Sequence, residues 1–263
     1  MNRQTKLISW HVLVAFLAWK LWEYGKYASF NSFTGVDLEP ASVLNFLLLI
    51  SVIVLGYILF QQRRWAWTIG GIVGLLFLAM LGWTLLNLVA VGALLLFNLW
   101  SATRVRREIH ERRILNIVDA FYHGLLPVVL GLFIMISFAA YQSPFAEEVK
   151  KTDRLPSQAE TIVRSIVEKT IGNKVEGTTP QQKQRAIDQV ASQTFQEFNR
   201  ILKPYFQYAP PVLAFGLFLI LWGLSFLFVW AGMVIGMALY WILKRFKVVR
   251  IETRQVDAEV LVV

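Results

Sequence analysis

Two side chains able to exchange protons lie four residues apart in a strongly apolar stretch of this sequence. Asp119 and His123 both belong to the segment 117–141, and their i, i+4 spacing places them on one face of a helix. Ionisable groups inside a membrane are costly and are functional candidates by default. The pair therefore predicts either a proton-coupled site or, since Asp119 lies only about one helical turn inside the segment, an ion pair or hydrogen bond near the membrane boundary.

The other polar residues that we single out in the apolar stretches are few, and their types commonly form hydrogen bonds between membrane helices. They are His11, Asn45, Thr68, Thr84, Asn87 and Asn98. We group His11, Asn87 and Asn98 with Asp119 and His123 as a candidate intramembrane polar site. A transport path requires these groups to converge on one cavity in the folded protein, and scattered side chains would exclude it.

Motifs for catalysis and metal binding are missing from the sequence. There are three histidines, none with zinc-site spacing, and no cysteines. Neither a G-x-S-x-G nucleophile turn nor a G-x-x-x-x-G-K-[ST] phosphate loop occurs. We therefore predict no catalytic residue, no metal site and no cofactor.

The composition is that of a membrane protein. Of 263 residues, 56% are hydrophobic and 16% are charged, whereas soluble domains carry about 25% charged residues. Mean hydropathy is +0.53. Several apolar runs reach the length of about 20 residues that a transmembrane helix needs. These values exclude a soluble domain with a single core.

Residues 1–141 are predicted to form a region with five membrane spans. We place them at about 7–22, 43–60, 65–81, 84–100 and 117–141. As one helix, the 36 uncharged residues from Trp65 to Trp100 would be about 54 Å long, nearly twice the hydrocarbon thickness. We therefore expect two helices joined by a turn near Gly82 and Trp83.

The first predicted span resembles a secretory signal peptide in having a basic start and an apolar centre. Trp19, Lys20 and Trp22 occupy the position where small residues would form a cleavage site. An uncleaved helix is therefore the favoured interpretation.

A sixth span is predicted within 209–243. Its apolar part from Pro211 onward is long enough for about 50 Å of helix, so it must tilt, extend beyond the bilayer or break. Gly223 and Gly232 are the candidate points for a break.

Charge predicts the orientation. With six spans and a cytoplasmic N-terminus, the cytoplasmic side carries fourteen basic and five acidic residues. The external segments carry eleven of each, so the whole net charge of +9 falls on one side, as the positive-inside rule requires. Both termini are therefore predicted to be cytoplasmic, with residues 142–208 outside the cytoplasm.

Basic residues at the cytoplasmic ends of the spans are expected to face anionic lipid headgroups, at about 1 kcal/mol each. They are Arg104, Arg106, Arg107, Arg112, Arg113, Lys244, Arg245 and Lys247. The first five are expected in a loop between the fourth and fifth spans. A nucleic-acid patch would carry similar charge, but no recognition module accompanies these residues, so no nucleic-acid partner is expected.

The external segment 142–208 is predicted to contain a hairpin of two amphipathic helices. One begins at Ser157, and the other begins at Thr179 and ends before Pro204, each with a capping-box pattern at its start. Their apolar faces predict either a small packing core or a surface for a partner. The candidate partner-binding residues are Ile162, Ile166, Phe195 and Phe198.

The remaining patterns concern the tail and the small residues. Residues 244–263 form a basic tail whose β-branched part, 248–263, predicts either a strand that pairs with a partner or a disordered tail.

Gly70 and Gly74, like Gly232 and Gly236, have G-x-x-x-G spacing, which favours close helix packing within the chain over dimerisation.

These observations predict an all-α multi-pass membrane protein with six transmembrane helices and an external helical hairpin. The leading hypothesis is a non-enzymatic envelope scaffold or assembly subunit that binds partners through the hairpin. The alternative is a transporter or channel subunit with a polar path near Asp119 and His123. An intramembrane enzyme is a third hypothesis and would need a polar cavity with at least two titratable groups.

Overall fold

The computed structural model describes residues 3–27, 40–111, 116–142, 164, 180–202 and 209–249. Within these residues the chain forms helices and no strand. The helices are α1 (Arg3–Tyr27), α2 (Pro40–Phe60), α3 (Arg64–Leu81), α4 (Leu85–Glu111), α5 (Ile117–Tyr141), α8 (Pro180–Leu202), α9 (Ala209–Gly223) and α10 (Ser225–Arg245). Five of them, α2, α3, α4, α5 and α10, are long and apolar enough to cross a membrane. The architecture is consistent with an α-helical membrane protein.

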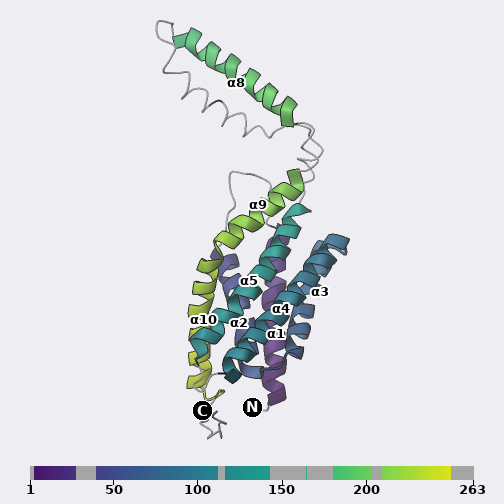
Figure 1. Cartoon of the computed structure of the whole chain (residues 1–263), viewed down its shortest axis with the longest axis vertical. Helices are drawn as coiled ribbons and strands as arrows, with labels where there is room; N and C mark the ends of the chain where they lie inside the picture. The colour runs from purple at the N-terminus through teal and green to yellow at the C-terminus, as the bar shows by residue number, and fades with distance from the viewer. Residues whose placement is uncertain are drawn as a thin grey trace, which may run out of the picture.

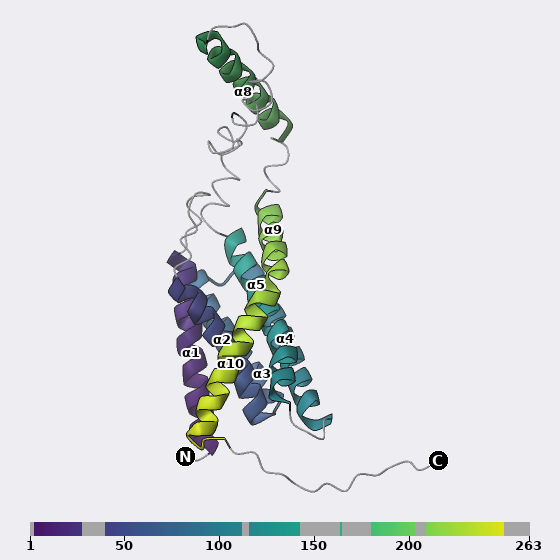
Figure 2. The ribbon, with the colours of Figure 1, turned by 90° about the vertical axis from the view of Figure 1, so that its left-hand side faces the viewer.

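Helices α1 to α5 and α10 lie side by side as an elongated bundle, as both Figure 1 and Figure 2 show. Helix α9 continues from α10 at one end of this bundle, and α8 stands clear of it in both views. The start of α1 and the end of α10 lie together at the opposite end. One end of the bundle therefore leads toward α8, and the other holds the start of α1 and the end of α10.

The predicted turn in the uncharged stretch is confirmed. Helix α3 ends at Leu81 and α4 begins at Leu85. Between them Gly82 has φ of 96°, a left-handed conformation that favours glycine. The Thr84 hydroxyl accepts a hydrogen bond of 3.2 Å from the backbone N–H of Asn87 and so caps the start of α4.

The prediction that Arg104, Arg106 and Arg107 lie in a loop is wrong. Helix α4 continues to Glu111, so Arg104, Arg106 and Arg107 lie on its last turns and not in a loop. The reason is that this part of α4 still packs against α5: the Ser101 hydroxyl donates to the carbonyl of Gly124 at 2.7 Å, and Val105 is fully buried. The other two arginines expected in the loop, at 112 and 113, lie outside the described residues.

The apolar segment predicted as a sixth span forms two helices. Helix α9 ends at Gly223, and α10 begins at Ser225. The backbone N–H of Leu224 still donates to the carbonyl of Ile220 at 3.0 Å. The backbone N–H of Leu227 donates to the carbonyl of Leu224 at 3.0 Å. The break therefore occurs at Gly223, whereas Gly232 lies inside α10 and packs against α2.

Helix α1 is attached to the bundle by two buried tryptophans. The Trp10 indole N–H donates to the carbonyl of Val52 on α2 at 2.9 Å, and that of Trp22 donates to Val73 on α3 at 3.2 Å. The Trp10 ring lies over Gly56, where an added Cβ would overlap the indole. Glycine at position 56 thus permits the close approach of α1 and α2.

Both G-x-x-x-G pairs pack within the chain, as expected. Cβ atoms added at Gly70 and Gly74 would lie 2.8 Å from Leu95 and 2.6 Å from Val91 on α4. The second pair, at positions 232 and 236, faces Ile50 of α2 and the Phe121 ring of α5. These small residues bring α3 against α4 and α10 against α2 and α5.

The structure also describes part of the segment predicted to be external and part of the tail. Helix α8 begins at Pro180, as the capping pattern predicted. The predicted helix from Ser157 lies outside the described residues except for Arg164, which forms a 2.7 Å ion pair with Asp188 of α8. In the tail, Val248 and Val249 are not in a strand, and the later positions lie outside the described residues.

Candidate functional site

Asp119 lies in the first turn of α5 and takes part in its N-terminal cap. The side-chain oxygen of Asn116 accepts from the backbone N–H groups of Val118 at 3.1 Å and Asp119 at 3.4 Å. The amide of Asn116 in turn donates to the Asp119 carboxylate at 2.9 Å. A carboxylate is also favoured here by the positive end of the helix dipole. This geometry fits a structural role at the helix start.

His123 lies close to the carboxylate of Glu108 on α4. Its Nε2 lies 3.5 Å from Oε1 of Glu108, and both side chains are partly buried. The ion pair forms only when the imidazole is protonated, and it joins the start of α5 to the end of α4. Asp119 and His123, which were predicted to share a helix face, therefore contact two different residues, Asn116 and Glu108.

His11 bridges α1 and α3. Its Nε2 lies 3.1 Å from the Thr68 hydroxyl, and its Nδ1 lies 2.8 Å from the carbonyl of Leu7 in its own helix. The ring also packs edge-on against Trp65 at 5.4 Å. This arrangement matches the predicted role of an interhelical hydrogen-bonding residue.

Asn98 is fully buried and is held by Tyr57 of α2. The Tyr57 hydroxyl donates to Asn98 Oδ1 at 2.7 Å, and the Asn98 amide donates to the carbonyl of Leu94 at 3.0 Å. Tyr57 itself is 2% exposed. Tyr57 was not among the residues predicted from the sequence, although an isolated tyrosine within the second predicted span was the available signal.

Changing Tyr57 to phenylalanine is expected to destabilise the protein by about 1 kcal/mol, because a buried asparagine oxygen loses its donor. The measurement is the thermal unfolding midpoint of purified protein in a mild detergent, followed by tryptophan fluorescence. Tyr122→Phe is the matched control, since Tyr122 is 53% exposed. Equal midpoints for the two variants would show that the Tyr57–Asn98 bond contributes nothing.

Asn87 belongs to a polar cluster at the other end of the bundle. Its amide donates to the carbonyl of Gly82 at 2.8 Å, and its oxygen accepts from the Gln142 amide at 2.6 Å. Gln142 also accepts from the Thr84 hydroxyl at 2.9 Å. The cluster ties the α3–α4 turn to the end of α5, so Asn87 has a structural partner that the sequence did not identify.

The structure does not bring the five candidate polar residues together. The hydrogen bonds and ion pair described above go to different neighbours, and none of the five residues lines either of two large cavities in the described part of the protein. The described residues also contain no cluster of three or more His, Asp or Glu side chains suited to a metal ion. His11, Asn87, Asn98 and His123 thus join different helices in pairs, whereas Asp119 belongs to the cap of its own helix.

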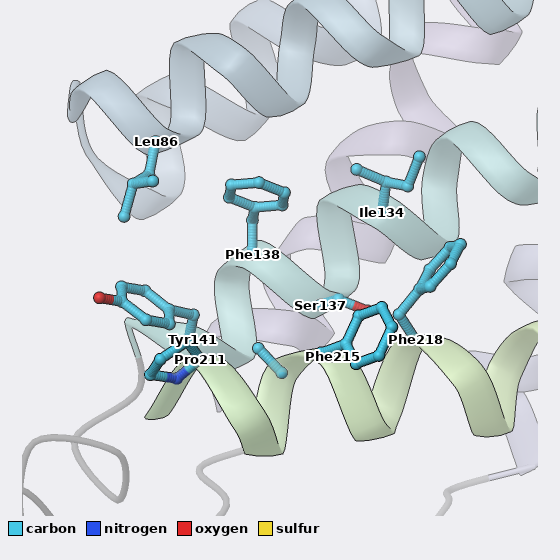
Figure 3. A pocket seen from close by; sticks show the side chains of 9 residues that line it. Leu86, Ile134, Ser137, Phe138, Tyr141, Pro211, Phe215 and Phe218 are labelled. Carbon is cyan, nitrogen blue, oxygen red and sulfur yellow. The ribbon is translucent and has the colours of Figure 1, made fainter. Parts of the chain in front are cut away.

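One of these cavities lies between α4, α5 and α9, with a volume of about 540 Å³ (Figure 3). Figure 3 shows Leu86 of α4, Ile134 and Phe138 of α5, and Phe215 and Phe218 of α9 around it. Its walls are almost entirely apolar, and the Ser137 hydroxyl is bonded at 2.8 Å to Phe133 of its own helix. Such a cavity suits hydrocarbon.

Basic side chains gather where α1 and α3 begin and α2, α4 and α10 end. The described members are Arg3, Lys6, Arg63, Arg64, Arg104, Arg106, Arg107, Lys244, Arg245 and Lys247. At this end the Lys6 ammonium joins α1 to the segment after α10, because it donates to the carbonyl of Val248 at 2.6 Å. The guanidinium groups of Arg64 and Arg104 lie over the rings of Trp65 and Trp100 at 4.6 and 4.7 Å, contacts typical of a membrane interface.

Helix α8 has an apolar face that is open at its C-terminal end. Ala191 is buried, whereas Phe198 is 47% and Ile201 60% exposed. Phe195 is half-buried beside them. The candidate residues at 162 and 166 lie outside the described residues. The open part of the face is therefore the last two turns of α8.

Comparisons with protein-family models, curated proteins and solved structures each found no match to this chain.

Proposed function

We propose that this chain is a non-enzymatic multi-pass membrane protein that binds a partner protein of the cell envelope through the open apolar face of α8. In this proposal six helical segments cross the bilayer, both termini are cytoplasmic, and the region of α8 is external. The observation that carries the proposal is an amphipathic helix that stands clear of the bundle and exposes Phe198 and Ile201.

In this proposal helix α1 crosses the bilayer in addition to the five long apolar helices α2, α3, α4, α5 and α10. One side of it is buried against α2 and α3, and the opposite side exposes Ile8, Val12, Phe16 and Trp19 at 45% or more. A helix that is apolar on both its inner and outer sides is suited to contact with lipid. Near its far end Lys20 pairs with Glu23 at 2.7 Å, which lowers the cost of placing these charges near the membrane boundary.

The orientation rests on the basic end of the bundle. Positively charged residues are retained on the cytoplasmic side during insertion, so the end that carries Arg3, Arg104 and Arg245 is assigned to the cytoplasm. The α8 region then lies on the other side, where a partner of the envelope is accessible.

The transporter alternative has less support. It required the polar residues to converge on one cavity, whereas His11, Asn98 and His123 contact three different helix partners. Both large cavities have mainly apolar walls. Pairwise hydrogen bonding between helices accounts for these side chains without a conduction path.

The test is a double substitution, Phe198→Lys with Ile201→Lys. Two charges on the apolar face are expected to abolish partner binding, since each would be desolvated on docking. The measurement is quantitative mass spectrometry of proteins that co-purify with the tagged full-length chain in a mild detergent.

The matched control is Gln189→Lys with Gln196→Lys, which adds the same charge to exposed positions on the opposite face of α8. A protein retained by the control and lost from the apolar-face variant supports the proposal, provided both variants have the same thermal midpoint. Identical co-purifying proteins for the two variants, or none for the wild type, would reject it.

A further inference from the structure

A second large cavity forms a groove between α1, α2 and α10 at the basic end of the bundle. Its volume is about 560 Å³, within the range of about 300–1,000 Å³ typical of ligand sites. Its walls are mainly apolar, and no acidic residue is among the described residues that line it. Its apolar lining includes Leu13, Val52, Leu55, Leu59 and Leu239.

The chemistry of the groove changes along α1. Arg3 and Lys6 stand at its mouth, Ser9 follows, and Leu13 lies in the apolar part. The spacing places these residues close to one face of the helix, so charge, hydroxyl and hydrocarbon succeed one another along the groove. A phospholipid has the same order of groups, from phosphate through glycerol esters to acyl chain.

The basic mouth is shaped by the chain that follows α10. Lys247 adopts φ of 56°, and the backbone N–H groups of Lys247 and Val248 donate to Lys244 at 3.1 Å and Leu243 at 2.9 Å. This is the Schellman arrangement that ends many helices. It turns Val248 into the groove wall and presents its carbonyl to Lys6 at 2.6 Å.

Cationic donors remain at the mouth after this contact. The Lys6 ammonium has three N–H groups and uses one on Val248. Arg3 lies at the first position of α1, is exposed, and has a planar guanidinium suited to a phosphate oxygen pair. Because Arg3 and Lys6 are positively charged and the described lining contains no acid, the mouth is complementary to an anion.

We propose that this groove binds one anionic phospholipid, with its phosphate on Arg3 and Lys6 and an acyl chain between α1 and α10. The inference rests on the membrane location and orientation given under the proposed function. It assigns a defined lipid site to residues outside the basic clusters at 104–113 and 244–247.

The test is native mass spectrometry of the full-length protein released from detergent, titrated with palmitoyl-oleoyl phosphatidylglycerol or with the phosphatidylcholine of the same chains. We expect one phosphatidylglycerol to bind with a clear preference. Arg3→Gln is expected to weaken that binding on the order of fivefold, whereas Arg106→Gln, an exposed arginine at the same end but outside the groove, should have a clearly smaller effect.

Ser9→Trp provides a second variant that changes no charge. The added indole would fill the middle of the groove and is expected to remove the bound lipid while the thermal midpoint stays the same. The proposal is overturned if the wild type does not distinguish the two lipids, if Arg106→Gln acts like Arg3→Gln, or if Ser9→Trp still binds phosphatidylglycerol. Loss of the lipid preference alone leaves the partner function intact, whereas a chain recovered without detergent in the soluble fraction would reject both.

Discussion

Replacing Gly56 with alanine is expected to loosen α1 from α2 and to lower stability by about 3 kcal/mol, the sum of overpacking and a lost hydrogen bond. The new Cβ would overlap the indole of Trp10. That ring cannot move aside easily, because it is buried, stacks on Phe60 at 5.2 Å and meets Tyr57 edge-on at 6.0 Å. Displacing it also breaks its 2.9 Å bond to Val52.

The measurement is again the thermal midpoint in detergent, where we expect a fall of about 5–10 °C for this loss of stability. Gly71→Ala is the control, because a Cβ at Gly71 meets nothing within 4 Å. If Gly56→Ala and Gly71→Ala unfold at the same temperature, the close α1–α2 contact is not a determinant of stability.

Replacing Phe133 with alanine is expected to cost about 3 kcal/mol, because it empties a well-packed site. Phe133 is 1% exposed and lies between two other rings, stacked on Phe46 of α2 at 5.6 Å and edge-on to Phe228 of α10 at 5.2 Å. In a bilayer the loss comes mainly from these packing contacts, since lipid is as apolar as the side chain.

The phenylalanine cluster is where α2, α5 and α10 meet, so the expected effect includes weaker attachment of α10. Proteolysis and thermal unfolding in detergent would both detect it. Phe226→Ala on α10 is the matched control, because Phe226 is 59% exposed. A Phe133→Ala protein as stable as the Phe226→Ala protein would contradict the assigned role.

The sequence alone located most of the helices. The bounds 117–141 match α5, and the turn at Gly82 divides α3 from α4 as expected. These features are local, because a helix in a membrane satisfies its backbone hydrogen bonds within its own segment and a run of apolar residues suffices to define it. The end of α4 was misplaced because its final turns depend on burial of Ser101 and Val105 against α5.

Only the tertiary structure decided which polar residues meet. Spacing put Asp119 and His123 on one face, but the rotation of α5 against α4 brings His123 to Glu108 and leaves Asp119 in the helix cap. That rotation is set by close approaches at residues such as Gly124, where a Cβ would lie 2.5 Å from Val105 and 2.7 Å from Val54. The groove at Arg3 and Lys6 arises in the same way, from three helices distant in sequence. Local patterns specify helices, whereas contacts between distant segments determine how the helices are turned and what their side chains reach.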